Sequence, residues 1–138
     1  MNIEERVKIA EESRKRGYNC CQAVLCAFSD KYDDFTESQM LKVAEGFGGG
    51  MGLLSVCGAV TGMVMVAGLE NADGNTEKNT TKGATRKIAV DFQNKFKEKN
   101  QSLICSELKG VETKKVLRSC EGCIEDAIRI VGEYLGEK

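Results

Sequence analysis

The sequence predicts an all-α fold, a compact bundle of six or seven helices around one buried central helix. Apolar residues recur at spacings of three and four in several segments, and polar residues suited to helix caps precede many of these segments. No segment shows the strict apolar–polar alternation of a half-buried strand. The chain has 138 residues and no proline or low-complexity linker, so we expect one domain over residues 1–138.

The apolar periodicity and the breaker residues place the helices. They are expected over residues 2–15, 20–30, 36–44, about 57–69, 76–99, about 103–108 and 120–135. Gly17 ends the first helix, and Asn19 is a good N-cap for the second. Thr36 and Gln39 have the spacing of a capping box, and Ser119 precedes the last helix as its cap.

A glycine-rich segment separates the third helix from the fourth. Residues 45–52 read EGFGGGMG, and five glycines in eight residues predict a loop with unusual backbone angles or very close packing. The helix after it is apolar nearly all round, which predicts that it is the buried central helix. Gly58 and Gly62 within it are four apart, the spacing at which small residues let two helix backbones approach closely.

Composition excludes several function classes. Twenty Lys and Arg balance 21 Asp and Glu, which argues against nucleic-acid binding and against a polybasic membrane anchor. The chain has no histidine, which excludes Ser-His-Asp and Cys-His catalysis and every His-containing metal site. The longest apolar stretch, residues 59–69, is shorter than the roughly 20 residues that span a bilayer, so no membrane insertion is expected. Residues 1–15 lack the apolar region of a signal peptide, and we expect a cytoplasmic protein.

Cysteine is the most informative residue type. The seven cysteines are Cys20, Cys21, Cys26, Cys57, Cys105, Cys120 and Cys123. In a reducing cytoplasm, such a set is more typical of metal binding or catalysis than of structural disulfides. Cys120 and Cys123 form a C-x-x-C, a spacing that allows the two thiols to bridge or to share a metal. The βαβ context of thioredoxin-like proteins is absent.

Several cysteines lie at predicted helix N-termini. Cys20 follows the cap Asn19, Cys57 precedes the central helix, and Cys120 follows the cap Ser119. The free amides and the dipole at a helix N-terminus stabilise a thiolate and lower its pKa. Cys105, near the start of the short helix, is a weaker case of the same placement.

The two other cysteines have a structural interpretation. Cys21 and Cys26 lie in the body of the second helix. Buried free cysteines commonly act as small apolar side chains, so we expect these two in the core.

The segment Cys57–Gly62 reads C-G-A-x-x-G. With it, nearly the whole chain resembles the redox-active family named for its cysteine and glycine pattern, C_GCAxxG_C_C, a small single-domain family with four signature cysteines. Asn19-Cys20 resembles the first cysteine segment, and residues 46–52 resemble the glycine-rich stretch before C-G-A-x-x-G. The segment from Cys105 to Gly110 resembles the third, C-x-x-L-x-G.

The fourth signature cysteine has two candidates. Cys120 is preferred, because Ile124 and Ala127 follow it by four and seven residues, as in the final helix of the family. Cys123 is the alternative, and under the first assignment it is an extra cysteine, like Cys21 and Cys26. The resemblance implies redox activity or metal binding without supplying a reaction.

Three hypotheses follow. The first, placed slightly ahead, is thiol–disulfide chemistry as an oxidoreductase: Cys57 attacks a disulfide of an unknown redox partner or small thiol, and Cys20, Cys105 or Cys120 resolves the mixed disulfide. The second is a four-cysteine site for zinc or an iron–sulfur cluster with the same four residues as ligands, Cys123 replacing one of them as a variant. The third is a non-enzymatic helical interaction module in which cysteines and glycines serve packing alone.

Overall fold

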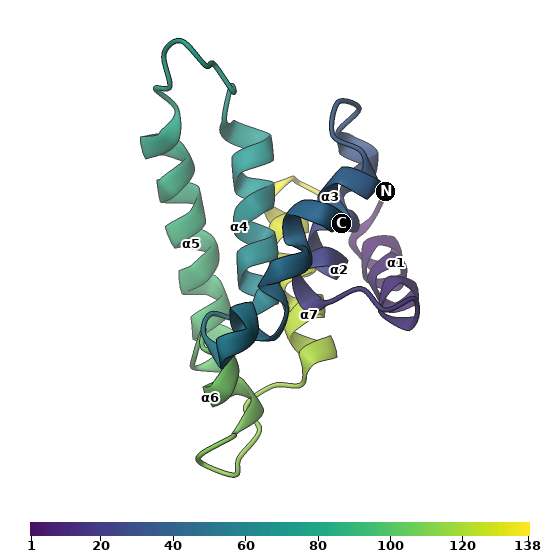
Figure 1. The fold of residues 1–138 in the computed structure, drawn as a ribbon, viewed down its shortest axis with the longest axis vertical. Coiled ribbons are helices and arrows are strands. Elements are labelled where there is room, and N and C mark those ends of the chain that lie inside the picture. Colours follow the sequence, from purple (N-terminus) through teal and green to yellow (C-terminus); the bar gives the residue numbers. More distant parts are fainter.

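The computed structural model describes residues 1–138 and confirms the all-α class, with seven α-helices and no β-sheet (Figure 1). The helices are α1 (Ile3–Lys15), α2 (Cys20–Cys26), α3 (Glu37–Ala44), α4 (Gly58–Asn71), α5 (Lys82–Asn100), α6 (Cys105–Lys109) and α7 (Cys120–Tyr134). Short helical turns are η1 (Ser29–Lys31), η2 (Glu45–Phe47) and η3 (Gly50–Leu54). None of the helices combines the length and the apolar composition that crossing a bilayer requires.

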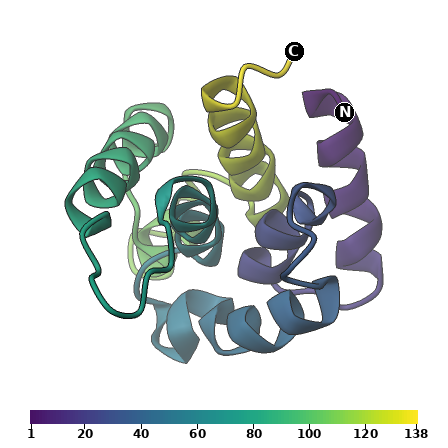
Figure 2. The ribbon, with the colours of Figure 1, turned by 90° about the horizontal axis from the view of Figure 1, so that it is seen from above.

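Helix α4 is the central element, as its composition predicts. It packs against α2, α5 and α7, and the view from above shows it between α5 on one side and α2 and α7 on the other (Figure 2). Its apolar side chains belong to one continuous core of 27 buried residues drawn from most of the helices. A helix surrounded in this way can be apolar on nearly every face.

The contact between α2 and α4 depends on two glycines. A Cβ added at Gly62 would lie 3.0 Å from both the Cys21 carbonyl oxygen and the Val24 Cβ. A Cβ added at Gly58 would lie 3.1 Å from the Cys21 amide nitrogen and 3.2 Å from the Cys20 Cβ. These distances confirm that the Gly58–Gly62 spacing serves close approach of two helix backbones.

The predicted helix caps are also confirmed. Asn19 and Thr36 each accept a hydrogen bond from the backbone amide three residues on, and the Gln side chain at that position accepts one from the cap's own amide. The Ser119 side chain accepts from the Gly122 amide. Gly17 (φ +95°) and Gly110 (φ +70°) follow the last residues of α1 and α6 in left-handed conformations that favour glycine.

Two helix boundaries differ from the sequence prediction. The helix expected from residue 76 begins only at Lys82, because the Asn75 side chain accepts hydrogen bonds from the amides of Glu77 and Lys78. This local bonding holds the segment in a turn that competes with a helix. The helix expected over residues 20–30 ends at Cys26. The carbonyl oxygen of the next residue, Ala27, accepts a hydrogen bond of 2.9 Å from the Arg6 guanidinium.

Arg6 is a buried charged residue that the sequence did not single out. Its side chain is almost fully buried and donates hydrogen bonds to the carboxylates of Asp30 and Glu137, with distances of 2.6–2.7 Å for the three shorter contacts. It thereby joins α1, η1 and the C-terminal tail, and the two chain ends lie on the same side of the molecule (Figure 2). The guanidinium is fully paired, as a buried charge must be.

The glycine contact predicts opposite effects for two identical substitutions in α4. Gly62→Ala gains about 1 kcal/mol of helix propensity but meets an overpacking cost of about 1–3 kcal/mol against α2. Gly68→Ala gains the same propensity, and nothing lies within 4 Å of its added Cβ. We expect Gly68→Ala to raise the free energy of unfolding and Gly62→Ala to lower it, as measured by urea denaturation under reducing conditions. Equal stability of the two variants would show that the contact is not tight.

Candidate functional site

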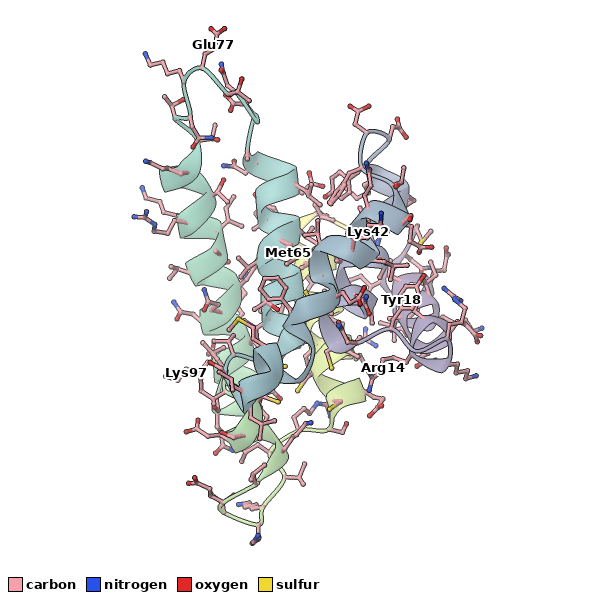
Figure 3. The ribbon with its side chains drawn as sticks, viewed as in Figure 1. Arg14, Tyr18, Lys42, Met65, Glu77 and Lys97 are labelled. Carbon is pink, nitrogen blue, oxygen red and sulfur yellow. The ribbon has the colours of Figure 1, made fainter.

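Five of the seven cysteines line one small cavity of about 40 Å³. Four of them mark the start of a helix: Cys20 in α2, Cys57 before α4, Cys105 in α6 and Cys120 in α7. Cys123, one turn into α7, is the fifth. The structure therefore brings together all four cysteines singled out as catalytic or metal-binding candidates and adds the alternative, Cys123. Figure 3 shows yellow sulfur atoms gathered toward the end of the bundle where α4 and α7 begin.

The two remaining cysteines lie elsewhere, as expected. Cys21 and Cys26 are completely buried in the apolar core. The sulfur of Cys21 lies 3.8 Å from that of Met65, which is labelled in Figure 3. Neither residue faces the cavity, and both act as small apolar side chains.

A short backbone pairing holds Cys57 and Cys105 side by side. The Cys57 amide donates to the Leu103 carbonyl at 2.8 Å, and the Cys105 amide donates to the Ser55 carbonyl at 2.6 Å. Between these bonds, Val56 and Ile104 form an isolated antiparallel bridge. This extended pairing explains why α6 begins at Cys105 rather than near residue 103, and it fixes the approach of two cysteines that are distant in the sequence.

The glycine-rich segment closes one side of the cavity. Gly49 (φ +62°) and Gly50 (φ +59°) both line it in the left-handed conformation. A Cβ at Gly50 would collide with the backbone of Ser55 and would lie 2.9 Å from the Cys105 Cβ. The segment thus shows both the unusual backbone angles and the close packing that its composition predicts.

Cys57 and Cys123 form an inner pair of thiols, 5% and 2% exposed. A hydrogen bond from the Cys123 thiol lowers the pKa of Cys57 to about 7 against the opposing effect of burial. The amides of Ala59 and Val60 and the charge of Lys109 lower this pKa further, although no cap hydrogen bond of ordinary geometry forms at Cys57. The same hydrogen bond and burial raise the pKa of Cys123. Cys57 is therefore the more acidic thiol of the pair, and Cys123 is the one that retains its proton.

Cys20 and Cys120 form an outer pair, and both are partly exposed. Burial raises the pKa of Cys20 to about 12, and the neighbouring Cys120 and Cys57, including a hydrogen bond with Cys120, add to this effect. The nearby charge of Arg14 offsets only part of it. The expectation that a helix N-terminus lowers the pKa of Cys20 is therefore wrong. For Cys105 it is also wrong, because burial raises that pKa as well.

Two cations that the sequence did not single out line the cavity, Lys109 and Arg118. Arg118 is held in place by Asp126, whose carboxylate accepts its Nε and Nη2 hydrogen atoms at 3.1 and 3.2 Å. Gly122 makes room for this arginine, because a Cβ there would collide with the guanidinium. The glycine inside the C-x-x-C was the available signal: a glycine in a helical first turn is unfavourable unless another group needs the space.

A larger surface groove lies beside the cavity, between α1 and α7, with a volume of about 670 Å³. Arg118 lines both hollows, and Ser119 and Glu121 in the groove wall flank Cys120 in the sequence. Charged side chains of both signs line the groove, among them Arg14 and Glu121. The groove and the cavity therefore adjoin at Arg118, next to the start of α7.

The thiols of the cavity suit a metal chemically but do not form a ready ligand cage. Four cysteine sulfurs are the usual donors for structural zinc and for iron–sulfur clusters. No three Cys, Asp or Glu side chains are arranged so that they could hold one ion. All seven cysteines are free thiols in the structure.

Most of the chain matches one known protein family. Residues 18–134, which include all five cavity cysteines, match the model of the family described as "Putative redox-active protein (C_GCAxxG_C_C)". The chain belongs to this family. Comparison with curated proteins and with solved structures gives no match.

The inner pair predicts a pH titration that depends on the hydrogen-bond donor. The ultraviolet absorbance of thiolate, measured as wild type minus Cys57→Ser, should rise with a midpoint near pH 7. Cys123→Ala removes the donor and should raise this midpoint, whereas Cys123→Ser retains a donor and should keep it low. The control Cys26→Ser should leave the curve unchanged, because burial raises the pKa of Cys26 to about 12. A midpoint near 9.0, the ordinary value, in the wild type would contradict the assignment.

Proposed function

We propose that this protein carries out thiol–disulfide redox chemistry, with Cys57 and Cys123 as the reacting pair. The observation that carries the proposal is that both thiols are buried and line one cavity, where each shifts the pKa of the other in the opposite direction. A thiolate is the reactive form of cysteine, and a neighbouring thiol is the second participant that disulfide formation requires. Cys123, the alternative at the sequence level, thus takes the role first given to Cys20, Cys105 or Cys120.

The burial of Cys57 implies that large partners react first at the outer pair. Cys120 attacks an external disulfide RS–SR, forming a mixed disulfide and releasing one RS⁻, which takes up a proton. Cys20 then attacks the Cys120 sulfur, releases the second thiol and leaves a Cys20–Cys120 disulfide. Cys57 attacks that disulfide and Cys123 resolves it, so the two electrons come from the inner pair and the outer thiols are regenerated. The reverse sequence oxidises an external dithiol.

The groove beside Cys120 supports a small thiol or disulfide as the exchanging molecule. Its volume of about 670 Å³ falls within the range of roughly 300–1,000 Å³ that is common for small-molecule sites. Low-molecular-weight thiols of the amino-acid class carry charges of both signs, and the groove lining also offers both signs, with Glu11 and Lys15 as exposed examples. We place this chemistry in a reducing cytoplasm, where free thiols persist.

A four-cysteine metal site is the second candidate, supported by the convergence of five thiols on one cavity. Because no three of them are arranged around one point, metal loading would have to draw the sulfurs together. Metal analysis of anaerobically purified protein separates the candidates: stoichiometric zinc or iron would favour the metal site. Seven thiols that remain inert without any metal would favour an interaction module.

An equilibrium measurement tests the proposed pair. Protein incubated to equilibrium with mixtures of reduced and oxidised dithiothreitol should form a Cys57–Cys123 disulfide, identified by peptide mapping without reduction. Cys57→Ser and Cys123→Ser should each abolish this bridge. Cys26→Ser removes a core thiol that does not line the cavity and should leave both the bridge and its midpoint potential unchanged.

The location of the bridge decides the outcome of this experiment. If the mixtures produce only bridges that exclude Cys57, or none even at the most oxidising ratio, the pairing is wrong. Slow equilibration does not affect the result, because the incubation is extended until reduced and oxidised starting protein give the same fraction of bridged protein.

A further inference from the structure

We propose that the cysteine cavity admits a hydroperoxide no larger than hydrogen peroxide and that Cys57 reduces it, a step that rests on the proposed pairing of Cys57 with Cys123. The proposal starts from a mismatch of sizes. The reacting pair lines a cavity of about 40 Å³, whereas the groove outside has about 670 Å³. The molecule that meets the inner pair directly therefore differs in size from the one that fits the groove.

The cavity volume sets the substrate class. A water molecule occupies roughly 30 Å³ of liquid, and roughly 10–15 Å³ of accessible cavity space is enough to hold one. Hydrogen peroxide, with two oxygen atoms, is the smallest common two-electron oxidant of thiols and fits 40 Å³. Drug-sized molecules need several hundred Å³. A disulfide of two amino-acid thiols or a peptide loop cannot reach Cys57 without displacing the packed walls.

The walls also explain why the cavity would not simply widen for a larger molecule. A Cβ at Gly50 would collide with the backbone of Ser55, and a Cβ at Gly58 would lie in tight contact, 3.1 Å from the Cys21 amide nitrogen. Leu108 fills another side and is 2% exposed. A close-packed boundary of this kind yields only if a helix moves. The cavity meets solvent where its lining is least buried, at the exposed Gly49 and Lys109 and the half-buried Cys20 and Cys120.

The reaction balances within the inner pair. The Cys57 sulfur takes one oxygen of the peroxide, the O–O bond breaks, and the departing hydroxide takes up a proton to become water. The sulfenic acid at Cys57 is then attacked by the Cys123 sulfur, an S–S bond forms, and a second water leaves with the Cys123 proton. The peroxide gains two electrons, and the two cysteines lose them. The outer pair, supplied with electrons by an external thiol, returns the bridge to two thiols.

The charges around the cavity suit this chemistry. Its lining includes the cationic Lys109 and Arg118 and no Asp or Glu. Positive charge near a peroxide stabilises the negative charge that develops on the departing oxygen. Arg118 is anchored to Asp126 outside the lining, so the cation is held at the wall rather than drawn to the sulfurs.

The test compares oxidants of different size on the full-length reduced protein. The quantity compared is the rate of Cys57–Cys123 bridge formation with hydrogen peroxide divided by the rate with tert-butyl hydroperoxide. We expect this ratio to be about tenfold or more higher in the folded protein than in the same chain unfolded in urea. Rates are followed by acid quenching and peptide mapping without reduction. In Cys123→Ser, hydrogen peroxide should leave a sulfenic acid at Cys57, trapped with dimedone after unfolding.

A matched pair of cavity variants separates access from general loosening. Leu108→Ala shortens a side chain in the cavity wall. It should lower the ratio of the hydrogen peroxide rate to the tert-butyl hydroperoxide rate toward the ratio measured for the unfolded chain. Val66→Ala also removes buried methyl groups, but from a part of the core that does not line the cavity. This variant should retain the preference for hydrogen peroxide over the larger peroxide. If Leu108→Ala does not fold, the comparison of oxidants on the wild type and the trapped sulfenic acid decide the proposal without it.

Two results overturn the inference in distinguishable ways. If both peroxides act in the ratio found for the unfolded chain while dithiothreitol still equilibrates the Cys57–Cys123 bridge, the size-selective peroxide step is wrong and the redox pair stands. If dithiothreitol produces no such bridge, the redox pair and the peroxide step fail together.

Discussion

The packing of α2 against α4 is the constraint on which the site depends. Gly58 and Gly62 have no Cβ, so the backbone of α4 touches the Cys20–Val24 segment of α2 directly. This contact is the reason that Cys20, at the start of one helix, and Cys57, just before the other, line the same cavity. A larger residue at either glycine would separate the helices and move the two sulfurs apart along with them. The C-G-A-x-x-G pattern therefore joins a cavity cysteine, Cys57, and the glycines that its placement requires in one short segment.

Two opposing effects decide which thiol is ionised. Four helix N-termini meet at the cavity, and each favours a thiolate. Burial favours the protonated form, and among the cavity thiols whose pKa shifts, it outweighs the helix effect at Cys20 and Cys105. At Cys57 the compensation is larger than the effect of burial, because the Cys123 thiol and the amides of Ala59 and Val60 all favour its ionised form. A helix N-terminus is thus insufficient by itself, and the thiol donor makes the difference.

The sequence predicted the elements that depend on local chemistry and missed those that depend on distant contacts. The caps at Asn19, Thr36 and Ser119 were predictable because their hydrogen bonds join residues three apart. The late start of α5 was missed because side-chain bonds from Asn75 compete with helical periodicity. The meeting of the cysteines was anticipated from their shared position at helix starts and from the family pattern. The role of Cys123 in the inner pair and the position of Arg118 in the cavity wall were not anticipated from the sequence. They depend on which side chains of α4 and α6 face the start of α7.

The proton content of the cavity links its chemistry to its burial. When Cys57 is ionised and Cys123 is protonated, the reduced inner pair holds one negative charge among buried side chains, and Lys109 and the amides of α4 offset it. Forming the disulfide removes that charge and releases one proton, so the oxidised cavity contains a neutral group. Several ionised thiolates together would instead need a bound cation, because burying uncompensated charge is costly. The raised pKa values of Cys20, Cys105 and Cys123 keep these thiols protonated more readily than Cys57, which limits the uncompensated negative charge around the cavity.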